Sequence, residues 1–401
     1  MSLLIRHARI LTLAGAPRPR RGAALKELGV IERGDVFVQE GKIATVGPEL
    51  PVPAEAEIIE ADGRVLMPGF VDCHTHACSA GDRFEEWDLK LKGVSYAEMM
   101  KKTGGIHATV RAVREATRKQ LAANLRARLD LMMRAGTTTV EVKSGYGLTI
   151  DGELKMLHAI QRAANEWPGT VVPTALLGQA TEGDPAEHMR MVAREMLPQV
   201  WHEFPGITVD ACCDEDGWTV EACVRLLERA KKHGLSIRVS ADQFTSMGMV
   251  PEALRLHATS IDHLNATTLS DATALAASHT FGVLLPAASF HIGTRYARTR
   301  KLLELGGLLA LATGFDPGRA PTHSMPFAIA LAVRHCGLTP AEAIAACTVN
   351  AASLLGLNDR GTIEAGQRAD LILLRHRDER LLAFELGDNP VDTVICAGKK
   401  M

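Results

Sequence analysis

Short apolar runs alternate with helical patterns through the middle of the chain. Most intervals between the runs place apolar residues three or four positions apart, which is the spacing of one helix face. Eight strands joined by helical crossovers predict an α/β fold of the (β/α)8 barrel type. A doubly wound sheet would also alternate, but no Gly-rich dinucleotide motif follows the first run. The predicted strands are Val65–Val71, Thr138–Val142, Val171–Leu177, Ile207–Cys213, Ser236–Val239, Ser260–Ile261, Gly282–Leu285 and Leu308–Ala312.

The helical patterns have clear bounds in only some of the intervals. After the last strand, Thr339 to Leu355 indicates further helices in series. The strongest patterns between strands are Val110–Ala135, Glu153–Ala164, Glu187–Val200 and Val220–Lys232.

The two ends of the chain resemble each other and differ from the middle. Short strands flank turn residues there, as in the stretch 35–46 and around Ala61-Asp62-Gly63, where hairpins are expected. Near the other end, Ala369–Leu374 and Thr393–Cys396 also have strand patterns. We therefore predict a small β-sandwich domain formed by residues 1–64 and 360–401, with a barrel of residues 65–359 inserted. The stretch 16–32, which opens with a Pro/Arg cluster, is the expected irregular loop.

Composition narrows the functional classes. The formal net charge is -2, so nothing favours nucleic acid or an anionic membrane as a partner. No apolar run approaches the ~20 residues of a membrane span, and the N-terminal residues have the pattern of a strand and not of a signal peptide. Eight cysteines without a regular spacing suit a reducing compartment, and we expect the cytoplasm.

The first predicted barrel strand ends in two histidines, His74 and His76. Alternate residues of a strand share a face, so the two imidazoles should point the same way. They could form a metal pair, since neutral imidazole is a common zinc ligand, or a hydrogen-bonded polar pair at the mouth of the barrel. The other polar residues at predicted strand ends are Lys143, Ser144, Tyr146, Gln179, Asp210, Cys212, Cys213, Asp214, Ser240, Gln243, His263 and Asp316.

Three of these residues have two interpretations each. Lys143 could be a substrate-binding or carbamylated lysine, or it could form an ion pair with Glu141 or another acid. Cys212 and Cys213 could be nucleophilic, but cysteine is also an ordinary small core residue, and we favour that interpretation.

These motifs together resemble the imidazolonepropionase family of histidine degradation, in the amidohydrolase superfamily. The resemblance covers nearly the whole chain, and its most specific parts are Ala80-Gly81-Asp82-Arg83 and Lys143-Ser144-Gly145-Tyr146-Gly147-Leu148. It implies that Arg83, Tyr96 and Tyr146 hold the propionate and ring of the substrate and that His263 works beside the scissile bond. A guanidinium fork suits a carboxylate chemically.

The sequence departs from this family at the catalytic centre. The family is expected to bind one metal with the first-strand His pair, a His after strand five and an Asp after strand eight. Here Ser240 replaces that His, Gly314 replaces the Asp, and Gln243 replaces the acid/base Glu. After strand three, Gln179 and its neighbours replace a stretch that carries a substrate-facing His.

From these departures we predict a hydrolase that cleaves a C–N or C–S bond of an imidazolone-type ring carrying a propionate, with no metal or other cofactor. The substrate would be imidazolone propionate or a ring-modified analogue such as a thio or methylthio form, in degradation of histidine or a histidine derivative. His263 would transfer protons, Asp316 would act as a base or hold a protonated ring nitrogen, and Gln243 would hydrogen-bond the ring. The other predicted substrate-binding residues are His74, His76, Ser240 and Gly318, and a homodimer is expected.

Two alternatives remain open at this point. The protein could be a non-catalytic homologue that binds imidazole-type carboxylic acids. It could also keep zinc on three imidazoles, those of His74, His76 and His263, with one open coordination position.

Overall fold

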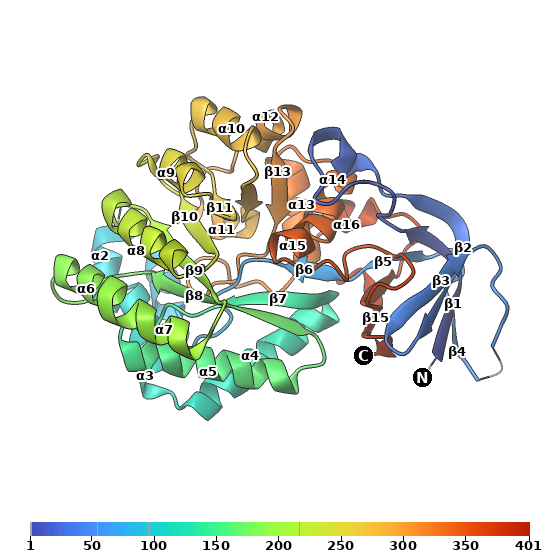
Figure 1. The fold of residues 1–401 in the computed structure, drawn as a ribbon, viewed down its shortest axis with the longest axis horizontal. Coiled ribbons are helices and arrows are strands. Elements are labelled where there is room, and N and C mark those ends of the chain that lie inside the picture. The colour runs from blue at the N-terminus through green and yellow to red at the C-terminus, as the bar shows by residue number, and fades with distance from the viewer. Residues whose placement is uncertain (1, 54, 95, 216) are drawn as a thin grey trace.

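The computed structural model describes residues 2–53, 55–94, 96–215 and 217–401, without the side chains of residues 96, 97, 100 and 101. The chain forms a barrel surrounded by helices, and a second sheet at one side of the barrel combines both chain ends (Figure 1). This arrangement confirms the predicted barrel with a small β unit from the two ends. No helix among the described residues is long and apolar enough to cross a membrane.

The barrel contains eight parallel strands in which each strand pairs with its neighbours in the sequence. A parallel bridge between Thr75 and Phe315 joins the segments that follow the first and last strands. All the predicted strands are present, and most of their side chains are buried. The strands are β6 (Phe70–Asp72), β7 (Thr137–Lys143), β8 (Thr170–Gly178), β9 (Thr208–Cys213), β10 (Ile237–Ala241), β11 (Ser260–His263), β12 (Phe281–Leu284) and β13 (Leu308–Leu311).

The helices cover the outside of the barrel, and two of the predicted helical runs are interrupted. The run predicted at Val110–Ala135 is two helices, because Thr117 starts the second one with a capping box in which it and Gln120 bond each other's backbone N–H groups. The run at Glu187–Val200 contains a π-helical turn, Val192–Met196. The helices that follow the first three barrel strands are α1 (Phe84–Leu91), α2 (Tyr96–Thr103), α3 (Ile106–Glu115), α4 (Arg118–Arg134), α5 (Ile150–Glu166), α6 (Pro185–Met191) and α7 (Leu197–Glu203).

The helices in the second half of the chain agree more closely with the predicted helical segments. Helix α8 (Val220–Lys232) has the predicted bounds, and the stretch after the eighth strand contains several helices in series. The helices before the eighth strand are α9 (Met249–Arg255), α10 (Leu269–Ala276), α11 (Pro286–Ile292) and α12 (Thr299–Glu304), and those after it are α13 (Met325–His335), α14 (Pro340–Ala346), α15 (Val349–Leu354) and α16 (Leu381–Phe384).

The strands of the chain ends form one continuous mixed sheet, and two details differ from the prediction. The segments on either side of Ala61-Asp62-Gly63 do not pair as a hairpin, because both lie parallel to the first strand of the chain. The apolar run Val65–Val71 divides between the two sheets, so that only its end belongs to the barrel. The strands are β1 (Ser2–Leu11), β2 (Val30–Gln39), β3 (Lys42–Gly47), β4 (Glu57–Glu60), β5 (Val65–Pro68), β14 (Leu371–Leu374), β15 (Val391–Cys396) and β16 (Lys399–Lys400).

The remaining predictions about the ends hold in part. The hairpin of β2 and β3 is present, with Gln39 paired to Lys42. The expected loop at 16–32 contains a 3-10 helix, Gly22–Lys26, and its end already belongs to β2. The chain thus passes from β5 of this sheet directly into β6 of the barrel, and the histidine pair follows the carboxyl end of β6.

Candidate active site

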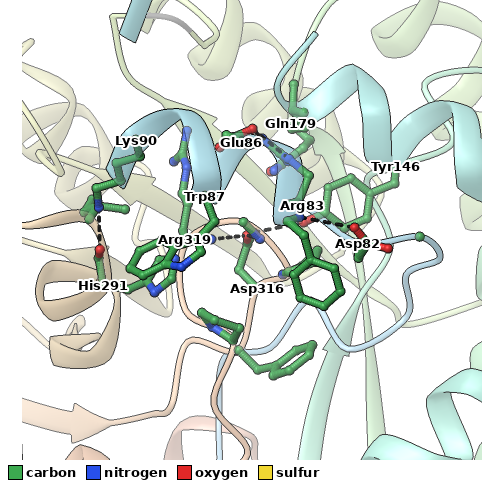
Figure 2. A pocket seen from close by; sticks show the side chains of 18 of the residues that line it. Asp82, Arg83, Glu86, Trp87, Lys90, Tyr146, Gln179, His291, Asp316 and Arg319 are labelled. Atoms are coloured by element: carbon green, nitrogen blue, oxygen red, sulfur yellow. Dashed lines mark hydrogen bonds and ion pairs between the residues drawn. The ribbon is translucent and has the colours of Figure 1, made fainter. Parts of the chain in front are cut away.

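A large cavity of about 980 Å³ opens at the carboxyl ends of the barrel strands. Its wall comes from α1, from the loops after β7, β8, β9 and β13, and from the end of α11. Figure 2 shows Arg83, Tyr146, Asp316 and Arg319 gathered around it. This is the end of a (β/α)8 barrel at which catalytic groups are found.

The three predicted strand-end histidines lie together beside this cavity. The ring centres of His74 and His76 are 5.4 Å apart, and that of His263 is 6.0 Å from His74. The ring of His76 is also 5.8 Å from the ring of Tyr146, which lines the cavity. All three histidines are buried, and the Nδ1 atoms of His76 and His263 have no hydrogen-bond partner within the described structure. A buried polar atom without a partner is costly, so these atoms are available to a ligand or water.

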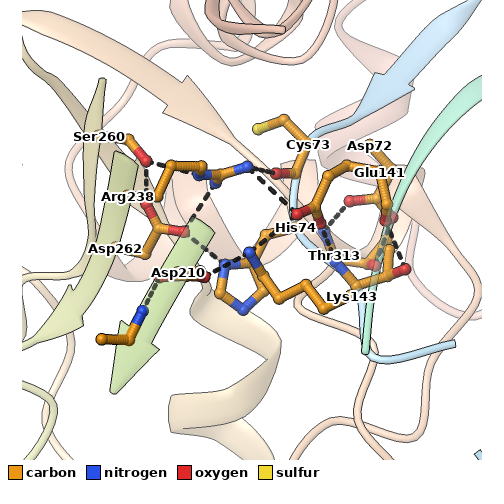
Figure 3. Close-up of polar contacts among 12 residues, drawn as sticks. Asp72, Cys73, His74, Glu141, Lys143, Asp210, Arg238, Ser260, Asp262 and Thr313 are labelled. Atoms are coloured by element: carbon orange, nitrogen blue, oxygen red, sulfur yellow. Dashed lines mark hydrogen bonds and ion pairs between the residues drawn. The ribbon is translucent and has the colours of Figure 1, made fainter. Parts of the chain in front are cut away.

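A buried network of charged side chains surrounds His74 (Figure 3). Lys143 Nζ donates to Glu141 Oε1 at 2.9 Å and to Asp210 Oδ2 at 2.7 Å. Asp210, Asp262 and Glu141 raise the pKa of Lys143 against the opposing effects of burial and Arg238. The lysine is therefore held as a cation by two carboxylates, which corresponds to the ion-pair interpretation of its sequence position.

The same network orients His74. Its Nδ1 atom lies 2.6 Å from Asp262 Oδ2, and that oxygen also accepts a hydrogen bond from Arg238 at 2.7 Å. An ionised carboxylate can only accept, so His74 carries its proton on Nδ1 and presents Nε2 as an acceptor. Burial lowers the pKa of His74 well below its ordinary value, helped by the charge of Lys143, so the ring is neutral.

The site residues fit a catalytic metal poorly. Among the described residues, no group of three or more His, Cys, Asp or Glu side chains is placed so that it could hold a metal ion. Gly314 offers no ligand, and its φ of +64°, with Leu285 atoms 3.3 Å from where a Cβ would lie, disfavours a larger residue there. The remaining neutral imidazoles alone are a weaker ligand set than one completed by a carboxylate.

Asp316 lies in the wall of the cavity with both carboxylate oxygens engaged. Oδ1 accepts from the backbone N–H groups of Gly318 at 2.7 Å and Arg319 at 2.8 Å, and Oδ2 accepts from the Tyr146 hydroxyl at 2.9 Å. Burial opposes ionisation, but His76, Arg319 and these hydrogen bonds lower the pKa of Asp316 below its ordinary value. The side chain is thus a fixed anion that presents negative charge to the cavity.

Tyr146 owes its position to a clamped loop after β7. The carboxylate of Glu153, at the start of α5, accepts hydrogen bonds from the backbone of Gly145, Gly147 and Leu148. A Cβ at Gly147 would lie 2.3 Å from the backbone of Gly152, so only glycine permits this close approach. Burial and the neighbouring Asp316 raise the pKa of Tyr146, and its hydroxyl therefore stays protonated as a donor.

His263 stands in a strained backbone conformation at the end of β11. Its φ is +83°, and the next residue, Leu264, also has a positive φ of 62°. Such conformations in bulky residues persist only when the surrounding structure imposes them, and they concentrate at functional sites. Burial and the charge of Arg319 lower the pKa of His263 to about 3, so the ring is neutral at physiological pH.

The predicted carboxylate-binding residue Arg83 lines the cavity, where its guanidinium contacts other residues of the protein. Its guanidinium forms an ion pair with Glu86 and donates to Thr109 Oγ1 at 3.4 Å. It also packs against Gly318, where a Cβ would lie 3.0 Å from Nη1. Arg83 and Gly318, both predicted to contact substrate, are therefore in direct contact with each other.

The structure also brings Gln243 next to a residue that the sequence analysis did not single out, Arg319. Arg319 Nη1 donates to Gln243 Oε1 at 2.7 Å, and its guanidinium lies 5.6 Å from the ring centre of Phe244. The only sequence signal for Arg319 was its place three residues after Asp316. The pairing needs the segments after β10 and β13 to meet, which spacing along the chain does not reveal.

The other predicted residues have more varied surroundings. Ser240 is buried near the end of β10 and pairs in register with Asp262 and Cys212. Cys212 and Gln179 line the cavity, whereas burial raises the pKa of Cys212 to about 12, so its thiol is protonated and weakly nucleophilic. The side chain of Tyr96 lies outside the described residues.

Three further cavity residues were missed because they come from distant elements. Trp87 of α1 stacks on His291 of α11 with ring centres 4.7 Å apart, and Lys90 lies 5.5 Å from the Trp87 ring centre. Lys90 also donates to the backbone carbonyl of His291 at 2.5 Å. These contacts join α1, which follows the first barrel strand, to α11, which follows the seventh (Figure 2).

Comparisons with known proteins agree with this architecture. The amidohydrolase family model matches residues 65–401. An imidazolonepropionase from Deinococcus radiodurans is 42% identical over 385 residues, covering 96% of each chain. One from Herpetosiphon aurantiacus is 41% identical over 404 residues, covering 96% of this chain and 94% of the relative.

Solved structures resemble the chain at much lower identity. A triazine hydrolase variant has a TM-score of 0.75 at 16% identity and covers 100% of this chain and 94% of its own. A Xaa-Pro dipeptidase has a TM-score of 0.71 at 17% identity, with 100% of both chains covered. At these identities the likeness concerns the fold alone.

Proposed function

The chain belongs to the amidohydrolase family as a hydrolase similar to imidazolonepropionases, and on that premise we propose that it opens an imidazolone-type ring that carries a propionate. The substrate is imidazolone propionate or a ring-modified analogue, and the reaction belongs to degradation of histidine or a histidine derivative. The curated relatives at about 40% identity support this substrate class.

One observation carries the proposal. A single cavity combines the cation of Arg83, the donor Tyr146 and the anion Asp316, and neutral imidazoles lie beside it. A carboxylate needs a cation with several donors, and a nitrogen heterocycle needs a mixture of donors and acceptors. The cavity offers both, in the positions that the resemblance assigns to propionate and ring.

We assign complementary roles to the residues around the ring. Asp316 holds a positively polarised ring N–H, since it is an anion whose two oxygens are held in place by the hydrogen bonds that they accept. His263 is neutral and buried with Nδ1 unpaired, so it accepts the proton of the attacking water and returns it to the leaving atom. Gln243, whose Nε2 has no partner among the described residues and which precedes the cavity residue Phe244, hydrogen-bonds the ring.

We further propose that the reaction proceeds without the usual catalytic metal. The support is the ligand set itself, in which Ser240 and Gly314 stand at the metal-ligand positions of the family that the sequence resembles. A metal site that lacks a carboxylate and one imidazole loses much of its affinity. A substrate with a good leaving group, such as a thiol or methylthiol on the ring, would need less electrophilic assistance than an amide.

The experiment is a turnover assay after removal of metals. Protein treated with a strong chelator and dialysed would be offered imidazolone propionate and its thio and methylthio forms, and ring opening or thiol release would be followed by absorbance and mass. We expect turnover of at least one of the three acids, with no gain on adding zinc. Absence of turnover with all three, with and without zinc, would favour a non-catalytic binding protein, and turnover only with zinc would refute metal independence.

A further inference from the structure

We propose that Arg319 supplies the positive charge that stabilises the oxyanion formed on the ring carbonyl during attack by water. This inference rests on the proposed ring-opening activity. It identifies the residue that takes over the electrostatic role of the usual catalytic metal. When water attacks, its oxygen bonds to the carbonyl carbon, the π electron pair moves onto the carbonyl oxygen, and a proton passes to His263. Collapse restores the C=O bond, breaks the C–N bond, and delivers that proton to the departing nitrogen.

The loop that carries Arg319 is rigid. The backbone of Asp316 and Ala320 exchanges two hydrogen bonds of 3.0 and 3.1 Å, which closes the loop. The Asp316 side chain then fixes its interior by accepting from the N–H groups of Gly318 and Arg319. Preorganised charge is what makes oxyanion stabilisation effective, because little reorganisation is needed during the reaction.

The guanidinium is oriented into the cavity from two sides. Gln243 Oε1 accepts from Nη1 at 2.7 Å, and the Phe244 ring supports the planar group at 5.6 Å from its centre. Arginine has only donors, so the amide oxygen of Gln243 must face it, and the amide Nε2 then points elsewhere. That Nε2 is buried without a partner among the described residues, on a side chain that is 1% exposed, so its hydrogen atoms remain available to a ligand.

The identity of residue 243 affects the net charge around the guanidinium of Arg319. A glutamate in place of Gln243 would form an ion pair with Arg319 and oppose its charge. The amide instead holds the guanidinium by a neutral hydrogen bond and adds no negative charge beside it. The loss of the family acid and the presence of Arg319 are thus two parts of one arrangement, in which a fixed cation faces the site of bond cleavage.

Arg319 differs from the other arginine of the cavity in a way that separates their roles. Arg83 stands at the start of α1, where its guanidinium fork suits a permanent carboxylate on the substrate, whereas the charge of Arg319 acts on His263 and Tyr146, next to the proposed reacting atoms. We therefore expect Arg319 to affect kcat and Arg83 to affect KM.

Three variants test the proposal in the chelator-treated protein. Arg319→Ala should lower kcat by about 10²- to 10³-fold, the usual effect of losing one oxyanion donor, and should raise KM much less, by about tenfold. Millimolar guanidinium should restore part of that kcat. Gln243→Glu should lower kcat at least about tenfold by opposing the charge of Arg319. Arg295→Ala is the matched control, because Arg295 donates to the backbone of Phe244 from outside the cavity.

Several outcomes would overturn the assignment. A rise in KM without a fall in kcat for Arg319→Ala would make Arg319 a carboxylate ligand. A higher kcat for Gln243→Glu, or an equal loss in Arg295→Ala, would remove the electrostatic explanation. Failure of guanidinium to restore any activity, while the folded variant still binds substrate, would do the same.

A binding measurement separates this proposal from the proposed function. Calorimetry would compare hydantoin propionate, whose ring bears carbonyl groups, with imidazole propionate, whose ring has none. The wild type should prefer the first by about tenfold or more, and Arg319→Ala should lose that preference. If the wild type turned over no substrate, the proposed function would fail while this result still decided the role of Arg319. A preference that is absent in the wild type or unchanged in the variant would contradict it.

Discussion

Asp262 Oδ2 lies 2.6 Å from His74 Nδ1 and 2.7 Å from the guanidinium of Arg238, so one buried oxygen joins a histidine to a cation. All three residues are buried, with 0 to 2% exposure. The pair sets the proton position of His74, and Ser260 donates to the other oxygen of Asp262 at 2.6 Å. The position of the first-strand histidines thus depends on residues of β10 and β11.

Removing the charge of Asp262 should destabilise the protein. Within the described residues, Asp262→Asn leaves Arg238 with the more distant carboxylate of Glu141, at 3.4 Å, as its ion-pair partner. Breaking one side of a buried ion pair costs about 3 kcal/mol. Urea unfolding would measure the loss. Asp271→Asn, on the exposed start of α10, is the control and should change stability by less than about 0.5 kcal/mol. Equal losses in both variants would contradict a special role for the buried network.

The acid dependence of stability should report on His263. The pKa of His263 is lowered from 6.5 to about 3 in the folded protein. As the pH falls below 6.5, the unfolded chain therefore binds a proton at His263 that the folded chain does not bind. The contribution of His263 to the free energy of unfolding is therefore complete above pH 6.5 and declines as the pH falls toward 3. Between pH 7.5 and 5 the wild type should lose about 2 kcal/mol more than His263→Gln.

Denaturant titrations of both proteins at the two pH values would provide that comparison. His74 and His76 are present in both proteins, so the difference isolates His263. Parallel pH dependences of wild type and variant would show that His263 titrates normally in the folded protein.

Loss of Arg83 should weaken substrate binding. A hydrogen bond to a charged group is worth about 1.5–3 kcal/mol, so Arg83→Met should raise KM about 10- to 100-fold while kcat changes little. Steady-state kinetics would measure both constants. Arg111→Met is a suitable control, because Arg111 is exposed on α3 and donates to the backbone of Thr103. A fall in kcat with constant KM in Arg83→Met would place Arg83 at the reacting bond instead.

Restoring the missing ligands should create metal affinity. Ser240→His together with Gly314→Asp would return an imidazole and a carboxylate to positions next to the histidine pair. We expect the double variant to retain zinc through dialysis, near one ion per chain by elemental analysis, and the wild type to retain little. Gly314→Asp alone should be destabilised because its left-handed φ of +64° strains a side chain near Leu285. Equal zinc content in wild type and double variant would refute this prediction.

The sequence predicted much of the fold because its signals are local. Apolar runs separated by helical patterns give the number and order of the barrel strands, and Pro-Gly-Phe-Val-Asp followed by His74 and His76 marks a strand end. The errors occurred where pairing is nonlocal. The turn at Ala61-Asp62-Gly63 looks like a hairpin, but its flanking strands pair with β1 instead, since a better partner exists elsewhere in the chain.

For the candidate site too, some features follow from the sequence and others only from the tertiary structure. The sequence by itself determined which chemical groups stand at the strand ends, including Ser240, Gln243 and Gly314. Only the tertiary structure decided their partners, because it brought Arg319 to Gln243 across 76 positions of the chain and Asp262 to His74 across 188. Local spacing fixes the side on which a residue points, whereas charge, protonation and orientation depend on neighbours that the fold alone brings together.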